Sequence, residues 1–76
     1  MRAMSQNTNQ IALIINGETV QAPALSTVAA LIAQMELDTR KLAIERNLEI
    51  VPRSQYAVTM LQDGDRLEIV HFVGGG

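Results

Sequence analysis

The sequence predicts a two-layer α+β domain in which one helix lies across one face of a β-sheet. Three features predict it: a β-hairpin pattern near the N-terminus, one amphipathic helical stretch after it, and a strand pattern close to the C-terminus. The chain has 76 residues, enough for one domain, and a chain of this length hides only roughly 60% of its unfolded surface. The core is therefore small, and a buried catalytic cleft is not expected.

The hairpin is predicted from side-chain alternation and from a turn dipeptide. Residues 11–15 alternate as a strand does, and Asn16-Gly17 follows where a two-residue turn needs positive φ. We expect a type I′ turn and a return strand over Glu18–Ala22. Pro23 should end that strand, because it cannot donate a hydrogen bond to a ladder.

One helix is predicted over Thr27–Met35, where apolar residues recur at helical spacing. Ser26 precedes it and is of a type that caps helix N-termini. The apolar stripe consists of Val28, Leu31, Ile32 and Met35. We expect this stripe to pack on the hairpin and to form part of the core.

The second half of the chain predicts short strands separated by turns, and its last strand continues directly into three glycines. In chain order we expect a strand at Leu42–Arg46, a turn at Asn47-Leu48, a strand at Glu49–Val51 stopped by Pro52, an irregular helical turn at Ser54–Ala57, a tight turn at Gln62–Asp65 and a final strand at Arg66–Val73. The domain organisation expected is a flexible leader at 1–9, a folded domain at 10–73 and a flexible glycine tail at 74–76.

Composition excludes several classes of protein. The chain contains no Cys, which rules out disulfides, zinc-thiolate sites and thiol nucleophiles. No apolar run approaches the roughly 20 residues of a membrane-spanning helix, and residues 1–10 lack the apolar stretch of a secretory signal. A cytoplasmic protein without a membrane partner is expected.

Charge and aromatic content argue against nucleic-acid binding. Six basic and eight acidic side chains give a net charge of −2, with no Lys/Arg cluster to neutralise phosphates. Tyr56 and Phe72 are the only aromatic residues, so there is no base-stacking platform. The expected partners are proteins, and the free chain is expected to be a monomer.

An ordered set of short segments resembles the ThiS family, the sulfur carriers of thiamine biosynthesis. The segments are Ile15-Asn16-Gly17-Glu18, Ser26-Thr27-Val28, Glu45-Arg46-Asn47, Glu49-Ile50-Val51-Pro52-Arg53, Asp63-Gly64-Asp65 and His71-Phe72-Val73-Gly74-Gly75-Gly76. The resemblance covers nearly all of Ile11–Gly76. It implies a ubiquitin-like β-grasp fold, with one helix on a mixed four- to five-stranded sheet in which the first and last strands are neighbours.

The resemblance also implies a relay that acts on the carboxylate of Gly76. A ThiF-like enzyme would adenylate it with ATP and magnesium, and sulfur from a donor protein would replace the adenylate to give a thiocarboxylate. A ThiG-like thiazole synthase would then accept the sulfur. The chain would itself bind no cofactor or metal and carry no catalytic residue. Two departures from the family are a longer leader and a third glycine, Gly74, before the usual diglycine.

The terminal glycines suit that chemistry. A free carboxylate is a poor acyl donor, so a partner must activate it. Glycine has no Cβ to clash in a narrow channel and adopts backbone angles closed to other residues. Gly74 and Gly75 would therefore thread into the partner's site, and Gly76 would be adenylated and thiocarboxylated there. Without context, such a run is more often a linker or a flexible end.

A docking surface beside the tail is predicted from strand parity. If Leu67 and Ile69 face the helix, Val70 and Phe72 lie on the opposite, solvated face. Ile14 is outward by the same parity. We define Ile14, Val70 and Phe72 as the outer patch and expect it to bind the adenylating enzyme, although exposed apolar residues are also common on ordinary sheet surfaces.

Other polar residues have simpler interpretations. His71 has no nucleophile or clustered carboxylate placed to work with it and is expected to be structural or solvated. Asp63 and Asp65 are expected to form a turn rather than a metal loop. Solvated charge pairs of little energetic weight are expected among Glu45, Arg46, Glu49 and Arg53.

Three other functions are compatible with the sequence. A carrier subunit of molybdopterin synthase resembles the chain in fold, tail and chemistry, although the Ile50–Arg53 segment and Tyr56 look like the thiazole branch. A ubiquitin-like modifier would be joined to lysines through its C-terminus. A β-grasp interaction module without covalent chemistry would not need Gly75 and Gly76.

Overall fold

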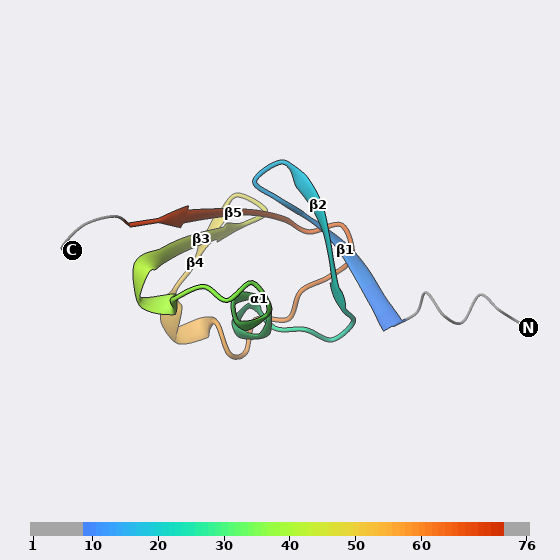
Figure 1. Cartoon of the computed structure of the whole chain (residues 1–76), viewed down its shortest axis with the longest axis horizontal. Helices are drawn as coiled ribbons and strands as arrows, with labels where there is room; N and C mark the ends of the chain where they lie inside the picture. Colours follow the sequence, from blue (N-terminus) through green and yellow to red (C-terminus); the bar gives the residue numbers. More distant parts are fainter. Residues whose placement is uncertain (1–8, 73–76) are drawn as a thin grey trace, which may run out of the picture.

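The computed structural model describes residues 9–72 and contains one five-stranded sheet with a single α-helix on one face (Figure 1). In chain order the elements are β1 (Gln10–Ile15), β2 (Glu18–Pro23), α1 (Val28–Gln34), the 3₁₀ turn η2 (Thr39–Lys41), β3 (Leu42–Arg46), β4 (Glu49–Val51), the 3₁₀ turn η3 (Arg53–Gln55) and β5 (Arg66–His71). The expectations for 1–8, for Val73 and for the glycine tail lie outside the described residues.

The sheet is mixed, with strand order β2-β1-β5-β3-β4. β1 pairs with β5 in parallel, whereas the β1–β2, β3–β4 and β3–β5 pairs are antiparallel. The chain thus places its first and last strands side by side at the centre, and α1 packs against the sheet (Figure 1). The predicted α+β, β-grasp arrangement of one helix on a mixed sheet is confirmed.

Both hairpin turns depend on asparagine in a left-handed conformation. Asn16 and Gly17 have φ values of 50° and 86°, which is the type I′ turn that the Asn-Gly dipeptide predicts. Asn47 and Leu48 also have positive φ, 51° and 74°. Leucine is costly in this region, so the second turn is the more strained of the two.

The side chain of Asn16 extends the parallel ladder beyond the end of β1. Its amide nitrogen donates to the carbonyl of Ile69 over 3.1 Å, and its amide oxygen accepts from the N–H of Ile69 over 2.8 Å. Its own backbone N–H donates to the carbonyl of Leu67. Asn16 therefore serves both the turn and the β1–β5 contact.

The helix is one residue shorter at each end than predicted. Thr27 is the N-cap, and its side-chain oxygen accepts from the N–H of Ala30 over 3.1 Å. Ser26 does not cap the helix; its hydroxyl donates to the carbonyl of Pro23 over 2.6 Å. Met35 is the C-cap. No helix within residues 9–72 is long and apolar enough to cross a membrane.

The core forms between α1 and the inner face of the sheet, as the parity of the strands predicts. Its buried members are Leu13, Ile15, Ala22, Val28, Leu31, Ile32, Leu42, Ile44, Val51, Tyr56, Leu61, Leu67 and Ile69. Met35 is half-buried and packs against this cluster rather than lying fully inside it.

The remaining differences from prediction lie at element ends. β2 includes Pro23, which is tolerated because β2 is an edge strand and Pro23 lies at its end, opposite Gln10. The expected helical turn at Ser54–Ala57 occurs as η3, which begins one residue earlier and ends at Gln55. β5 ends at His71. Asn9, placed by sequence in the leader, accepts from the N–H of Ala24 through its carbonyl over 2.9 Å.

Replacing Asn16 by Ala should destabilise the fold by about 1–3 kcal/mol, because both backbone groups of Ile69 then lose their partner. Asn16→Gly keeps the ease of positive φ while removing the amide, so it separates the hydrogen bonds from the turn strain. Urea unfolding measures both. A loss in Asn16→Gly below about 0.5 kcal/mol would show that the amide adds nothing beyond the turn.

Candidate functional site

The predicted reactive residues Gly74, Gly75 and Gly76 lie outside the described residues, so the described part of the site is the strand that leads to them. The N–H of Phe72 donates to the carbonyl of Lys41 over 2.8 Å, which continues the β3–β5 pairing one residue past β5. The sheet thus holds the backbone up to Phe72. Four residues follow in the sequence, and they can span at most about 14 Å.

The outer face of β5 carries the two predicted patch residues nearest the C-terminus. Leu67 and Ile69 are buried at 1% and 5% exposure, whereas Val70 and Phe72 are exposed at 54% and 52%. The alternation of burial along the strand is therefore as predicted. Val70 lies opposite the half-buried Ala43 of β3, so the outer face is apolar at this end.

Ile14 lies on the same sheet but not beside these two residues. It is half-buried, and the parallel register places it opposite Arg66, four residues before Val70. That offset corresponds to about 13 Å along the strand. Ile14 instead lines a pocket of about 220 Å³ near the two hairpin turns, together with Gly17, Glu45, Asn47, Leu48, Arg66, Leu67 and Glu68.

Two further exposed apolar residues, Leu48 and Ile50, were not among the predicted site residues. Leu48 is 91% exposed at the tip of the β3–β4 turn, and Ile50 is 65% exposed on the edge strand β4, opposite Glu45. The sequence could have predicted the exposure of Ile50, because side chains alternate along a strand and Ile50 is next to the buried Val51. The exposure of Leu48 follows from its place at the tip of the predicted Asn47-Leu48 turn, where its φ is 74°.

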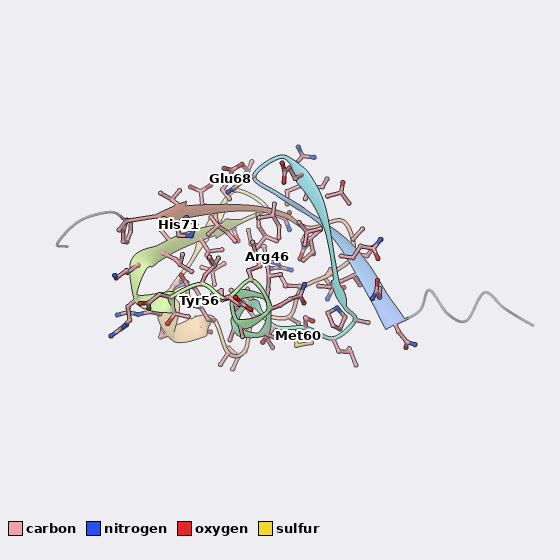
Figure 2. The ribbon with its side chains drawn as sticks, viewed as in Figure 1. Arg46, Tyr56, Met60, Glu68 and His71 are labelled. Carbon is pink, nitrogen blue, oxygen red and sulfur yellow. The ribbon has the colours of Figure 1, made fainter. Side chains whose placement is uncertain are left out.

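A pair of acidic residues divides this face. Glu45 and Glu68 lie directly opposite each other in the β3–β5 register, and like charges in that position repel across the strands. Figure 2 shows Glu68 on the side of the sheet away from α1, and Met60 near the helix. The apolar end with Val70 and Phe72 is thus separated from the pocket that Ile14 lines.

Asp65 accepts hydrogen bonds from three different residues and is only 6% exposed. One carboxylate oxygen accepts from Nε of Arg46 over 2.8 Å and from the N–H of Gln62, and the other accepts from the amide of Asn47. The prediction that Arg46 forms a solvated charge pair with neighbouring residues is therefore wrong. Its partner lies in a turn 19 residues away.

The environment of Asp65 lowers the pKa of its carboxyl group. Burial by itself raises that pKa. Hydrogen bonds from Arg46, the N–H of Gln62 and Asn47 together outweigh the effect of burial, so the pKa lies below its ordinary value of 3.8. A carboxylate held in this way stabilises the turn that starts β5. Its role is structural, since it lies at the opposite end of β5 from the tail.

In the described part of the chain, neither His71 nor Asp63 belongs to a cluster that could hold a metal ion. Between residues 9 and 72, no group of three His, Cys, Asp or Glu side chains is placed to hold a metal ion. Asp63 uses a carboxylate oxygen to accept from the N–H of Ala12 over 2.8 Å. The Asp63–Asp65 segment is a turn that fastens β1 to the start of β5, as predicted.

Comparison with known proteins gives a consistent result. The model of the ThiS family matches residues 7–76. The thiazole synthase of Paramagnetospirillum magneticum is 56% identical over 64 residues, which are 84% of this chain but 20% of that protein. The sulfur carrier protein ThiS of Bacillus subtilis is 40% identical over 65 residues, 84% of this chain and 98% of that protein.

A solved structure shares the fold. The crystal structure of the thiamine biosynthesis protein ThiS from Geobacter metallireducens matches with a TM-score of 0.75 and 26% identity, covering 87% of this chain and 100% of that one. Against the thiazole synthases that it matches, by contrast, the chain spans only about a fifth of their length.

The loss of folding stability at low pH should depend on Asp65. Since its folded pKa lies below the unfolded value, the carboxylate stabilises the fold above about pH 4, and this contribution is lost as the pH falls through the folded pKa. Asp65→Asn should be less stable at pH 7 and should show a flatter loss of stability below pH 4.

Asp38→Asn is the matched control for this experiment. Its ion pair with Arg40 lowers the pKa of Asp38 to about 2, but Arg40 is exposed and Asp38 is only half-buried, and a pair this accessible to solvent contributes little to stability. Urea unfolding between pH 7 and pH 2 measures both variants. An acid limb in Asp65→Asn as steep as that of the unmodified chain would contradict the role assigned to Asp65.

Proposed function

This chain belongs to the ThiS family, and from that premise we propose that it is a sulfur carrier of thiamine biosynthesis whose Gly76 carboxylate is adenylated and then converted to a thiocarboxylate. One observation carries the proposal: the family match continues through the last residue of the chain, directly beyond a strand that the sheet holds up to Phe72. The proposed reactive group is then the carboxylate of Gly76, and a folded head delivers it.

The chemistry requires little from the head. Transfer of AMP from ATP to the carboxylate, with release of pyrophosphate, gives a mixed anhydride with a good leaving group. A sulfide-level sulfur nucleophile can then displace AMP to leave a thiocarboxylate. ATP and magnesium act in the partner's active site. Gly74 and Gly75 let the terminus enter a narrow channel without side-chain clashes. The chain contributes the acyl group and the surface by which the partner holds it.

Three kinds of partner follow from this proposal: a ThiF-like adenylating enzyme, a sulfur donor protein and a ThiG-like thiazole synthase. The thiazole synthases that contain a segment similar to this chain support the last of them. They also favour the thiazole branch over molybdopterin synthesis. A cytoplasmic location and a monomeric free chain are part of the same proposal.

The outer patch is proposed as the surface that the adenylating enzyme grips. Val70 and Phe72 form its end nearest the tail, with about half of each side chain exposed. Ile14 forms its far end, across the Glu45–Glu68 pair. Because Phe72 is only four residues from Gly76 in sequence, contacts made there limit how far the terminus can lie from the partner's active site.

The mass of the intact chain tests the proposed function. After incubation with ATP, magnesium, a ThiF-like enzyme and a sulfur donor, the chain should gain the mass of sulfur and lose that of oxygen at the last residue. A chain with one extra residue after Gly76 should stay unmodified. If the same enzymes thiolate an established carrier but leave this chain unchanged, the proposal is wrong.

Truncating Phe72 to Ala should raise the KM of the adenylating enzyme for the carrier by about fivefold or more, because a half-exposed aromatic beside the reactive tail is a typical anchor. The kcat should change little. Val58→Ala is the matched control, since Val58 is 66% exposed but lies outside the outer patch. Equal KM values for the Phe72 and Val58 variants would remove Phe72 from the docking surface.

A further inference from the structure

The backbone hydrogen bonds of β5 alternate strictly between its two neighbours. Even-numbered residues pair with the β3 side: the carbonyl of Arg66 accepts from the N–H of Asn47, and the N–H of Phe72 donates to Lys41. Odd-numbered residues face β1: the carbonyl of Leu67 accepts from the N–H of Asn16. Ile69 uses both of its backbone groups on the side chain of Asn16.

His71 is the next residue in this series, and β1 does not reach it. The β1–β5 pairing covers only Ile14 with Arg66 and Ile15 with Leu67, after which the chain turns at Asn16 into β2. By alternation, the N–H and carbonyl of His71 point to the β1 side. No hydrogen bond to either group comes from any residue between 9 and 72.

The end of β5 therefore has an open edge although β5 is a central strand of the sheet. In Figure 1 the last part of β5 runs beyond the β1–β2 hairpin with β3 beside it, and in Figure 2 His71 lies near that end. An open edge with unpaired backbone groups is a template for another strand. Here it lies at the base of the functional tail.

We propose that an extended segment of the adenylating enzyme adds to this edge and pairs with the backbone of His71, which sets the register in which Gly76 enters the active site. The inference rests on the proposed function and specifies which backbone contact positions the tail in the partner's active site. Gly74, Gly75 and Gly76 offer no side chains, so only backbone groups can fix their position along a channel. The His71 edge is the last described point at which such pairing can begin.

A second copy of the chain fits this edge less well. The described open edge is one residue long, and pairing two copies through it would bury far less surface than the roughly 1,200 Å² of a stable interface. An enzyme that takes up the tail can extend the contact beyond this edge, over the exposed Val70 and Phe72 on either side of His71 and along the residues that follow.

The test compares a backbone change with a side-chain change at one position. His71→Pro removes the N–H that faces the open edge while leaving the bonds of Val70 and Phe72 to β3 possible. His71→Ala removes the imidazole but keeps the N–H. With a ThiF-like enzyme that accepts the unmodified chain, His71→Pro should lower kcat/KM for adenylation about tenfold or more, and His71→Ala should change it little.

Folding and mass controls make the outcome specific. Circular dichroism and the unfolding midpoint should show that His71→Pro is folded, and at high enzyme concentration its intact mass should still reach the thiocarboxylate. Loss of the edge is then distinguishable from failure of the carrier chemistry. A folded His71→Pro with unchanged kcat/KM, or an equal loss in His71→Ala, would overturn the proposal.

Amide hydrogen exchange decides the question even if His71→Pro does not fold. The His71 amide of the unmodified chain should exchange fast when free and about tenfold or more slowly when the adenylating enzyme is bound. Unchanged exchange in the complex would overturn the proposal. So would slow exchange in the free monomer, or protection that rises with carrier concentration alone, which would assign the edge to a second copy.

Discussion

The parallel contact between β1 and β5 is the constraint on which the rest of this small domain depends. It joins the N-terminal hairpin to the C-terminal strand through two paired positions, and a few backbone hydrogen bonds at its ends and the side chain of Asn16 extend it. Asp63 adds a bond to Ala12 at the start of the same seam. Polar side chains thus complete a sheet that the backbone alone leaves short. The fold can use such a brief contact because Leu13, Ile15, Leu67 and Ile69 beneath it are buried against α1.

Much of this architecture follows from the sequence, because its local signals agree with one another. The Asn16-Gly17 turn, the helical stripe beginning at Val28 and the alternation along β5 each specify an element by local chemistry. The pairing of strands is a different matter, since nothing local tells β1 to lie beside β5 in parallel. That neighbour relationship came from the family resemblance, and the structure confirms it.

The candidate site was less predictable for the same reason. Parity along one strand correctly turned Val70 and Phe72 outward, but it gives no position along the neighbouring strand. Ile14 was therefore grouped with Val70, about 13 Å away along the strand, and with Phe72, which lies farther still. Arg46 was assigned to nearby charges, whereas its partner Asp65 lies 19 residues on. Long-range contacts of this kind depend on register, which the sequence specifies only through the whole fold.

The short connection between Phe72 and Gly76 has a consequence for how the carrier passes from one enzyme to another. If two catalysts act on Gly76 in turn, each must bring its own active site within about 14 Å of Phe72 and therefore occupy nearly the same volume. The two enzymes would exclude each other sterically. The modified carrier would therefore have to dissociate from the first enzyme before it could bind the second. The overall rate of sulfur transfer would then depend on how fast each complex dissociates. Very tight binding to either enzyme would slow the supply of sulfur.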